Sequence, residues 1–199
     1  MTYLFIDTAN SFIISIIKDN KILYYKSDIS NSDTSSRVIP IIDEAFKSTN
    51  LTINDIDKIF VVNGPGSFTG IRVGVTIAKT ISYCLNKPLI SLSELELLAT
   101  TSTNSDYVVP IIDARRGYVY GAIYDKNLNT YYEDSHILLD KLKNKLPESY
   151  EFVDNSSNID LIKLIKKHQL DDAINPHELK PNYLKKTEAE ENLNDKRNN

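Results

Sequence analysis

The motif Asn63-Gly64-Pro65-Gly66-Ser67-Phe68-Thr69-Gly70-Ile71-Arg72-Val73-Gly74 holds four of the six glycines in this chain. It follows the apolar run Lys58–Val62, which is typical of a buried strand. Helical spacing of apolar residues then continues to about Leu85. A strand, a glycine turn and a helix in this order predict a phosphate-cradle-like layout, because the first N–H groups of the helix point at the turn.

Two known nucleotide motifs can be compared with this layout, and neither is present. The P-loop requires a lysine after its second glycine, whereas Ile71 follows Gly70. The dinucleotide-binding fingerprint requires a third glycine or an alanine at the position that Thr69 occupies. The motif therefore has the layout of a phosphate site without the residues of either named class.

Small residues recur at every fourth position, at Gly66, Gly70, Gly74, Ala78 and Ser82. A glycine inside a helix costs about 1 kcal/mol relative to alanine. Two such glycines indicate that another backbone comes close along this row of small residues. Either the helix packs tightly on its own sheet, or it forms a helix–helix seam with another chain.

The sequence from Gly64 to Gly74 resembles the signature of the TsaB (YeaZ) family. These proteins are small, non-catalytic members of the actin-like ATPase clan that support threonylcarbamoyladenosine synthesis on tRNA. Four further segments match in order, and they are Asp7-Thr8-Ala9, Val38–Asp43, Ile112–Gly117 and Pro181–Leu184. The resemblance covers about residues 2–186 and implies the α/β fold of that clan.

An internal repeat supports the same fold. The first unit consists of the apolar runs Thr2–Ile6 and Phe12–Lys18 around a turn that begins at Asp7. The second unit consists of Tyr107–Asp113 and Tyr118–Tyr124. We therefore predict an α/β protein of the ribonuclease-H-like/actin-like ATPase type, with a mixed five-stranded sheet in the first lobe and a reduced second lobe. The predicted boundaries are 1–102 for the N-terminal lobe, 103–187 for the C-terminal lobe and 188–199 for a disordered tail.

The other elements follow from apolar spacing and helix-boundary signals. Ser35 or Ser36 is expected to cap a helix that has Pro40 in or near its first turn. Ser93 is expected to cap a helix over Glu94–Thr101. The remaining predictions are strands at Lys21–Ser27, Leu89-Ile90 and Tyr150–Val153, and helices near Leu138–Leu146 and Asn158–Gln169.

Composition predicts a cytoplasmic protein that does not hold tRNA by itself. The net charge is −4, which argues against a basic nucleic-acid surface. The segment Met1–Asp7 lacks the basic region and cleavage site of a signal peptide, and no apolar run reaches the roughly 18 residues of a membrane span. The single cysteine, Cys84, excludes a disulfide framework and is expected to be a small buried apolar residue.

No catalytic residue and no metal ligand is predicted. The three histidines, His136, His168 and His177, have no ligand spacing. An N-cap role accounts for Ser67, and the Gly-x-Ser-x-Gly elbow is absent because Thr69 stands where its second glycine would be. We expect no cofactor on this chain alone, and the resemblance places ATP and metal on partner subunits.

A vestigial ligand site is nevertheless predicted where the two hairpin turns and the glycine motif lie. The turn after Asp7 contains no glycine, so Asn10, Ser11 and Phe12 crowd the place where a phosphate would approach the backbone. The residues assigned to this site are Asp7, Gly64, Gly66, Ser67, Asp113 and Arg115. They keep an alternative open, namely a small-molecule or nucleotide-binding, kinase-like member of the same clan that acts alone.

The helix of the glycine motif carries apolar residues on more than one face, which indicates a second contact. By resemblance, this helix and the helix around Pro40 pair with the same two helices of TsaD or of a second copy of this chain. TsaE would drive turnover, and tRNA would be met only through the complex. The residues predicted for the partner interface are Val38, Ile41, Ile42, Ala45, Gly70, Arg72, Val73, Gly74, Ile77, Ala78 and Ile81.

Overall fold

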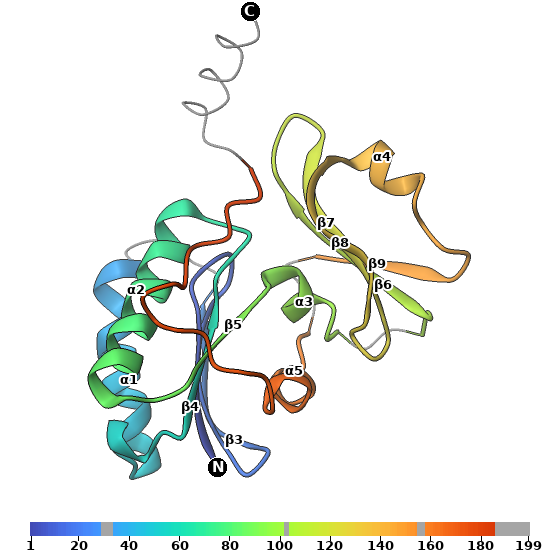
Figure 1. Cartoon of the computed structure of the whole chain (residues 1–199). Helices are drawn as coiled ribbons and strands as arrows, with labels where there is room; N and C mark the ends of the chain where they lie inside the picture. The colour runs from blue at the N-terminus through green and yellow to red at the C-terminus, as the bar shows by residue number, and fades with distance from the viewer. Residues whose placement is uncertain (29–33, 102–103, 155–157, 186–199) are drawn as a thin grey trace, which may run out of the picture.

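The computed structural model describes residues 1–28, 34–101, 104–154 and 158–185, which form two sheets and their helices. In Figure 1, α1 and α2 cover one face of the first sheet, α3 and α5 lie between the sheets, and α4 lies beyond the second sheet. The strands are β1 Thr2–Asp7, β2 Phe12–Lys18, β3 Lys21–Asp28, β4 Lys58–Val62, β5 Leu89–Leu92, β6 Tyr107–Asp113, β7 Tyr118–Asp125, β8 Thr130–Leu138 and β9 Tyr150–Val153. The helices are α1 Thr34–Thr49, α2 Phe68–Leu85, α3 Glu94–Leu98, α4 Leu139–Lys143 and α5 Leu161–His168, with a 3₁₀ turn at Ile53–Asp55.

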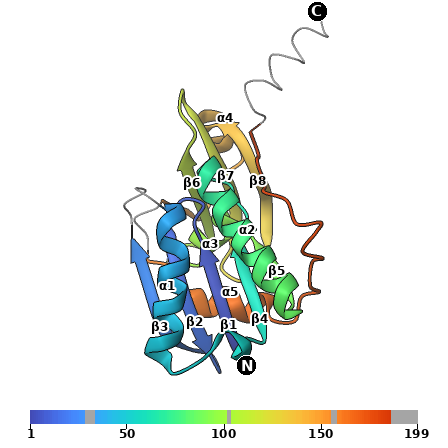
Figure 2. The same ribbon diagram turned by 90° about the vertical axis from the view of Figure 1, so that its left-hand side faces the viewer.

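The first sheet has the strand order β3-β2-β1-β4-β5. Strand β1 is antiparallel to β2, with Asp7 opposite Ile13, and parallel to β4, with Ile6 opposite Val61. Every residue of β1 is buried, as expected of a central strand with helices on both faces. Figure 2 shows α1 and α2 side by side on one face of this sheet. The predicted mixed, five-stranded sheet is confirmed.

The second sheet repeats this topology in the order β8-β7-β6-β9. Strand β6 is antiparallel to β7 and parallel to β9, as β1 is to β2 and β4. In the part of the chain that the structure describes, no strand corresponds to β5 in this sheet. The repeated unit and the reduced second lobe confirm the predicted ribonuclease-H-like/actin-like ATPase fold.

Two local predictions are wrong, and one strand was missed. Helix α1 begins at Thr34, so Ser35 and Ser36 lie inside it and cannot cap it, whereas Pro40 lies near the first turn as expected. Helix α3 is capped by Ser93 as predicted, but it ends at Leu98. Strand β8 was not expected, because it is an edge strand in which no residue is fully buried and the apolar alternation of a strand is missing.

The segment after α5 returns to the first lobe and runs beside α2 (Figure 1). The Ile174 N–H donates to the Leu89 carbonyl oxygen over 2.8 Å, and the Asn182 N–H donates to the Asn63 carbonyl oxygen over 2.7 Å. We call residues 170–185 the C-terminal strap. The predicted tail at 188–199 lies outside the described residues. None of the described helices combines the length and hydropathy needed to cross a bilayer.

Candidate functional site

The glycine motif forms the loop between β4 and α2, and Ser67 caps the helix. The Ser67 Oγ accepts a hydrogen bond from the Gly70 N–H at 3.2 Å, which confirms the predicted N-cap role. Gly64 has a φ of +126°, a conformation that side chains disfavour. A Cβ at Gly64 would also lie 2.5 Å from the Asn182 carbonyl oxygen of the strap.

The cradle above α2 is filled by the first hairpin turn, Thr8–Ser11. The Ser67 N–H, which would face a phosphate, donates instead to the Ala9 carbonyl oxygen at 2.5 Å. The Thr8 Oγ1 donates to the Gly70 carbonyl oxygen at 2.7 Å. A Cβ at Gly66 would clash with the Ala9 carbonyl, and one at Gly70 with the Thr8 carbonyl. The chain's own backbone therefore occupies the place that a bound phosphate would need.

The same contacts decide what the row of small residues packs against. A Cβ at Gly70 would clash with the Thr8 carbonyl, and added bulk at Gly74 would clash with the Thr8 side chain. Ala78 and Ser82 are also buried. Of the two alternatives, packing within its own lobe is the one that these contacts support, and a seam with another chain does not run along the row.

Most residues predicted for the partner interface are part of the core of the first lobe. The members that are buried within their own lobe are Val38, Ile41, Ile42, Ala45, Gly70, Gly74, Ala78 and Ile81. Their assignment to a partner contact is corrected, because their side chains are covered within this chain. Arg72 is exposed, and Val73 and Ile77 are half-buried.

The surface of α1 and α2 exposes two residues that the interface prediction did not name, Ile39 and Cys84. Ile39 of α1 is 54% exposed, although it is a large apolar residue. On α2, Val73 and Ile77, both predicted for the interface, are half-buried at the edge of the buried stripe and pack against the core, and the exposed Cys84 lies on the same side of the helix. The predicted burial of Cys84 is therefore wrong. We call Ile39, Val73, Ile77 and Cys84 the outer face.

Arg72, a predicted interface residue, holds the strap. Its guanidinium lies 3.9 Å from the centroid of the Phe68 ring, and its Nε donates to the Tyr183 hydroxyl at 2.8 Å. The Phe68 and Tyr183 rings are stacked at 4.7 Å. The Pro181–Leu184 segment, noted in the sequence only as a matching motif, is thus fastened to the start of α2.

The predicted ligand residues divide between two turns. Asp7, Gly64, Gly66 and Ser67 surround the filled cradle, whereas Asp113 and Arg115 lie in the hairpin turn between β6 and β7 of the other sheet. In that turn Asp113 is exposed and its Oδ1 accepts the Arg115 N–H at 2.9 Å. Arg115 and Arg116 both have positive φ, at +67° and +54°.

Asp7 is paired with an acid that the sequence prediction did not identify, Glu94. Both carboxyl groups are completely buried, and the Ala9 N–H donates to Asp7 Oδ1 at 2.7 Å. Burial raises the pKa of Asp7 to about 7, against the Ala9 and Glu94 hydrogen bonds that lower it. Burial and the Asp7 charge raise the pKa of Glu94 well above its ordinary value. An acid in the first turn of a helix is ordinary, so the sequence carried no signal for this pair.

A second charged cluster joins α3 to α5. Glu96 Oε1 accepts hydrogen bonds from Lys167 Nζ at 2.6 Å and from His168 Nε2 at 2.8 Å, and His168 Nδ1 lies 2.6 Å from Asp171 Oδ2. Burial alone would lower the pKa of His168, but its hydrogen bonds to Glu96 and Asp171 outweigh burial and raise the pKa. Among the described residues, no three His, Cys, Asp or Glu side chains lie where they could hold a metal ion.

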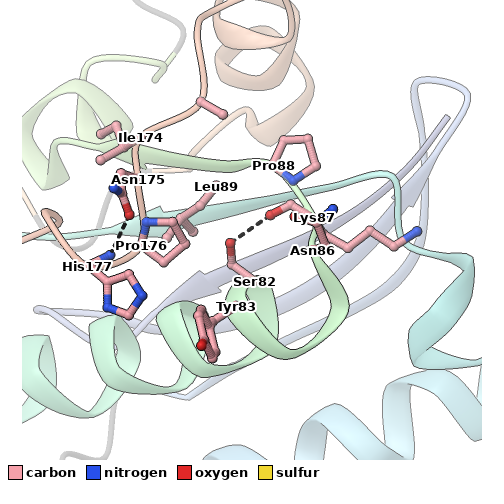
Figure 3. Close-up of a pocket in the computed structure, with 11 residues that line it drawn as sticks. Ser82, Tyr83, Asn86, Lys87, Pro88, Leu89, Ile174, Asn175, Pro176 and His177 are labelled. Carbon is pink, nitrogen blue, oxygen red and sulfur yellow. Dashed lines mark hydrogen bonds between the residues drawn. The ribbon is translucent and has the colours of Figure 1, made fainter.

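A groove of about 580 Å³ lies between the end of α2 and the strap (Figure 3). The Tyr83 and His177 rings meet edge to face at 5.0 Å on one side. The Ser82 hydroxyl donates to the Lys87 carbonyl oxygen at 2.6 Å, and the Lys87 ammonium donates to the Asn54 carbonyl oxygen at 3.2 Å. These two hydrogen bonds hold the end of α2 and do not involve the strap.

Comparison with known proteins identifies a matching family model and two named relatives. A family model described as "TsaD: tRNA N6-adenosine threonylcarbamoyltransferase" matches residues 28–171. The tRNA threonylcarbamoyladenosine biosynthesis protein TsaB of Bacillus subtilis is 35% identical over 144 residues, which cover 70% of this chain and 63% of that protein. The protein of the same name from Escherichia coli is 28% identical, over 65% of this chain and 57% of that protein. The chain thus spans less than two thirds of the length of either relative.

A solved structure of YeaZ from Pseudomonas aeruginosa has the same fold. It superposes with a TM-score of 0.75 at 19% identity, covering 92% of this chain and 99% of that chain. A second structure, described as an uncharacterized protein with similarity to peptidase YEAZ from the same organism, has a TM-score of 0.78 at 17% identity. It covers 92% of this chain and 99% of that one.

Proposed function

This chain, which the TsaD family model matches, belongs to the TsaB (YeaZ) family, and we propose that it is the non-catalytic subunit that binds TsaD. In this proposal TsaD transfers a threonylcarbamoyl group to the adenosine beside the tRNA anticodon. TsaD and TsaE supply the metal and ATP chemistry, and tRNA is met only through the complex. This chain contributes a helical surface that TsaD docks on.

The observation that carries the proposal is the filled cradle. The Ala9 carbonyl takes the Ser67 N–H, and neither Gly66 nor Gly70 leaves room for a further group. A clan member that hydrolyses a nucleotide needs these N–H groups for phosphate. The arrangement therefore favours a scaffold over the kinase-like alternative. Titration of ATP into the isolated chain separates the two, because binding with turnover would support the alternative.

The outer face supplies the surface for docking. Ile39 is a large apolar side chain left 54% exposed, and Val73 and Ile77 of the neighbouring helix are half-buried. Helices present such residues to a partner when their buried stripe already faces their own sheet. The same face fits a second copy of this chain, so a homodimer is the competing occupant.

Reconstitution of the modification tests the function. TsaD, TsaE, the threonylcarbamoyl-adenylate synthase and tRNA are combined with and without this chain. We expect modified adenosine only when the chain is present. Equal product without it would refute the proposal, and so would full transfer by this chain in the absence of TsaD.

The docking surface is tested by matched charge insertions. Ile39→Asp should weaken TsaD binding by about 2 kcal/mol or more, as for a central interface residue. Leu170→Asp is the control, because Leu170 is 90% exposed and follows α5, away from the outer face. Cys84 gives a second measurement, since alkylation of this single cysteine should slow when TsaD covers the face. Equal binding by both variants would exclude this surface.

A further inference from the structure

We propose that Asp7 and Glu94 share a proton at neutral pH, and that this proton holds the Thr8–Ser11 turn in the glycine cradle. The shared proton would belong to the chain by itself, whether or not TsaD binds it.

Asp7 and Glu94 lie at a junction of three segments of the first lobe. Asp7 ends β1, and Glu94 begins α3, whose first N–H donates to the Gly64 carbonyl oxygen at 2.9 Å. The acid pair therefore lies where the first hairpin turn, the glycine loop and α3 meet. Both residues have no exposed surface, so water cannot solvate the charges.

Among the described residues, no cation acts on either carboxyl group. Asp7 Oδ2 and both carboxylate oxygens of Glu94 lack a hydrogen-bond partner of good geometry in the described structure. The charge that acts on the Glu94 carboxyl there is that of Asp7, with the Asn10 amide and the Ser11 N–H as polar neighbours. Arg37 of α1 instead lies over the Phe12 ring, 5.1 Å from its centroid. The other acid of α3, Glu96, is held by Lys167 and His168. The residues of β2 and the glycine loop nearest the turn carry no charge.

Two adjacent buried carboxylates without a cation cannot both ionise, so one proton stays between them. The raised pKa of Asp7, to about 7, and of Glu94 agree with this arrangement. A hydrogen bond through the shared proton ties the hairpin turn to α3. Loss of that proton places two like charges in contact in a dry site, and the turn must move to admit water. The Ser67 N–H would then lose its Ala9 acceptor.

The shared proton makes the free energy of unfolding depend on pH. The folded state holds the proton more tightly than the unfolded chain, whose carboxyl groups titrate near their ordinary pKa values. The contribution of the shared proton to the free energy of unfolding is therefore fully present below about pH 4, and it is lost as pH rises through the folded pKa, about 7 for Asp7. For each proton retained only by the folded state, the unfolding equilibrium constant rises tenfold per pH unit within this window.

Urea unfolding at several pH values tests the proposal. The unfolding constant of the wild type should rise by up to about tenfold per pH unit between about pH 5 and pH 7, beyond the slope of the double variant Asp7→Asn/Glu94→Gln, which has no acid at this site. His168 is present in both proteins, so its own titration cancels. Glu178→Gln, which removes an exposed acid, should keep the wild-type slope. Equal slopes in the wild type and the double variant would overturn the proposal.

Two direct measurements guard against a variant that fails to fold. Infrared spectra of the wild type at neutral pH should contain the carbonyl stretch of a buried protonated acid, and the double variant Asp7→Asn/Glu94→Gln should lack it. Amide exchange should show the Ser67 N–H losing protection above about pH 7 while the Ile71 N–H, bonded to the Ser67 carbonyl at 2.9 Å, keeps it. Absence of the acid band, or stabilisation of the wild type but not Glu94→Gln by Mg²⁺, would identify a cation instead and refute proton sharing.

Discussion

The two hairpin turns occupy equivalent places in the two sheets but have opposite surroundings. Asp7 in the first turn is completely buried, and the glycine motif encloses the residues that follow it. Asp113 in the second turn is exposed, and two arginines in left-handed conformation follow it. No glycine follows Gly121 in the sequence, so the chain after β9 has no counterpart of the glycine motif. The glycine motif after β4, and not the hairpin itself, encloses the first turn.

The largest difference in stability is expected when one glycine in each lobe is replaced by alanine. Gly70→Ala should destabilise the protein by about 3 kcal/mol, because the new Cβ clashes with the Thr8 carbonyl and backbone must move. Gly117→Ala should cost about 1 kcal/mol, since the site has free space but a φ of +77°. Urea denaturation measures both. A smaller cost at Gly70 than at Gly117 would contradict the filled cradle.

The next test concerns the cluster that links α3 to α5. His168→Gln should cost about 2 kcal/mol at pH 6, since it removes charge-assisted hydrogen bonds to Glu96 and Asp171. The raised pKa of His168 means that this contribution is present below about pH 6.5 and is lost as pH rises through the folded pKa. Thermal unfolding at pH 6 and pH 9 should show the difference shrinking. His177→Gln serves as the control, because His177 is exposed.

The strap gives a smaller effect. Tyr183→Ala should cost about 1 kcal/mol, because it removes the ring stacked on Phe68 and the hydroxyl bonded to Arg72. Tyr183→Phe should lose less, since the stack remains. Limited proteolysis should cut the strap faster in Tyr183→Ala than in the wild type. Unchanged cleavage would show that other contacts hold the strap.

The smallest effect is expected at the second turn. Asp113→Ala removes one exposed hydrogen bond to the Arg115 N–H and should cost about 0.5 kcal/mol. Chemical denaturation is sufficient to measure it. A cost as large as that of Gly70→Ala would mean that the second turn is enclosed as tightly as the first, and the contrast between the lobes would fail.

Much of the framework could be predicted from the sequence. The apolar runs of β1, β2, β6 and β7 are uninterrupted and the turns between them are short, so local pattern determines both hairpins. Ser67 and Ser93 are N-caps because their side chains accept N–H groups of the first turn. These features depend on neighbours in sequence.

The rest depends on contacts between distant residues. Spacing alone could not say whether Gly70 faces Thr8 or another chain, because a row of small residues serves either contact. The pairing of Asp7 with Glu94 joins positions that carry no common pattern. The strap contains too few apolar residues for its sequence to predict the backbone hydrogen bonds that it makes with Leu89 and Asn63. The burial of the predicted interface residues on α1 could not be predicted for the same reason, because one apolar stripe can pack on a sheet or on a partner equally well.

The strap also has a consequence for the order in which the chain is made. Domains generally fold as units from the N-terminal end during synthesis. Here the backbone partners of Asn63 and Leu89 are residues 182 and 174, which leave the ribosome more than eighty residues after β5. Until they emerge, the Leu89 carbonyl on the outer side of β5 lacks its partner, and an open strand of this kind can pair with another nascent chain. The first lobe is thus begun first and completed last.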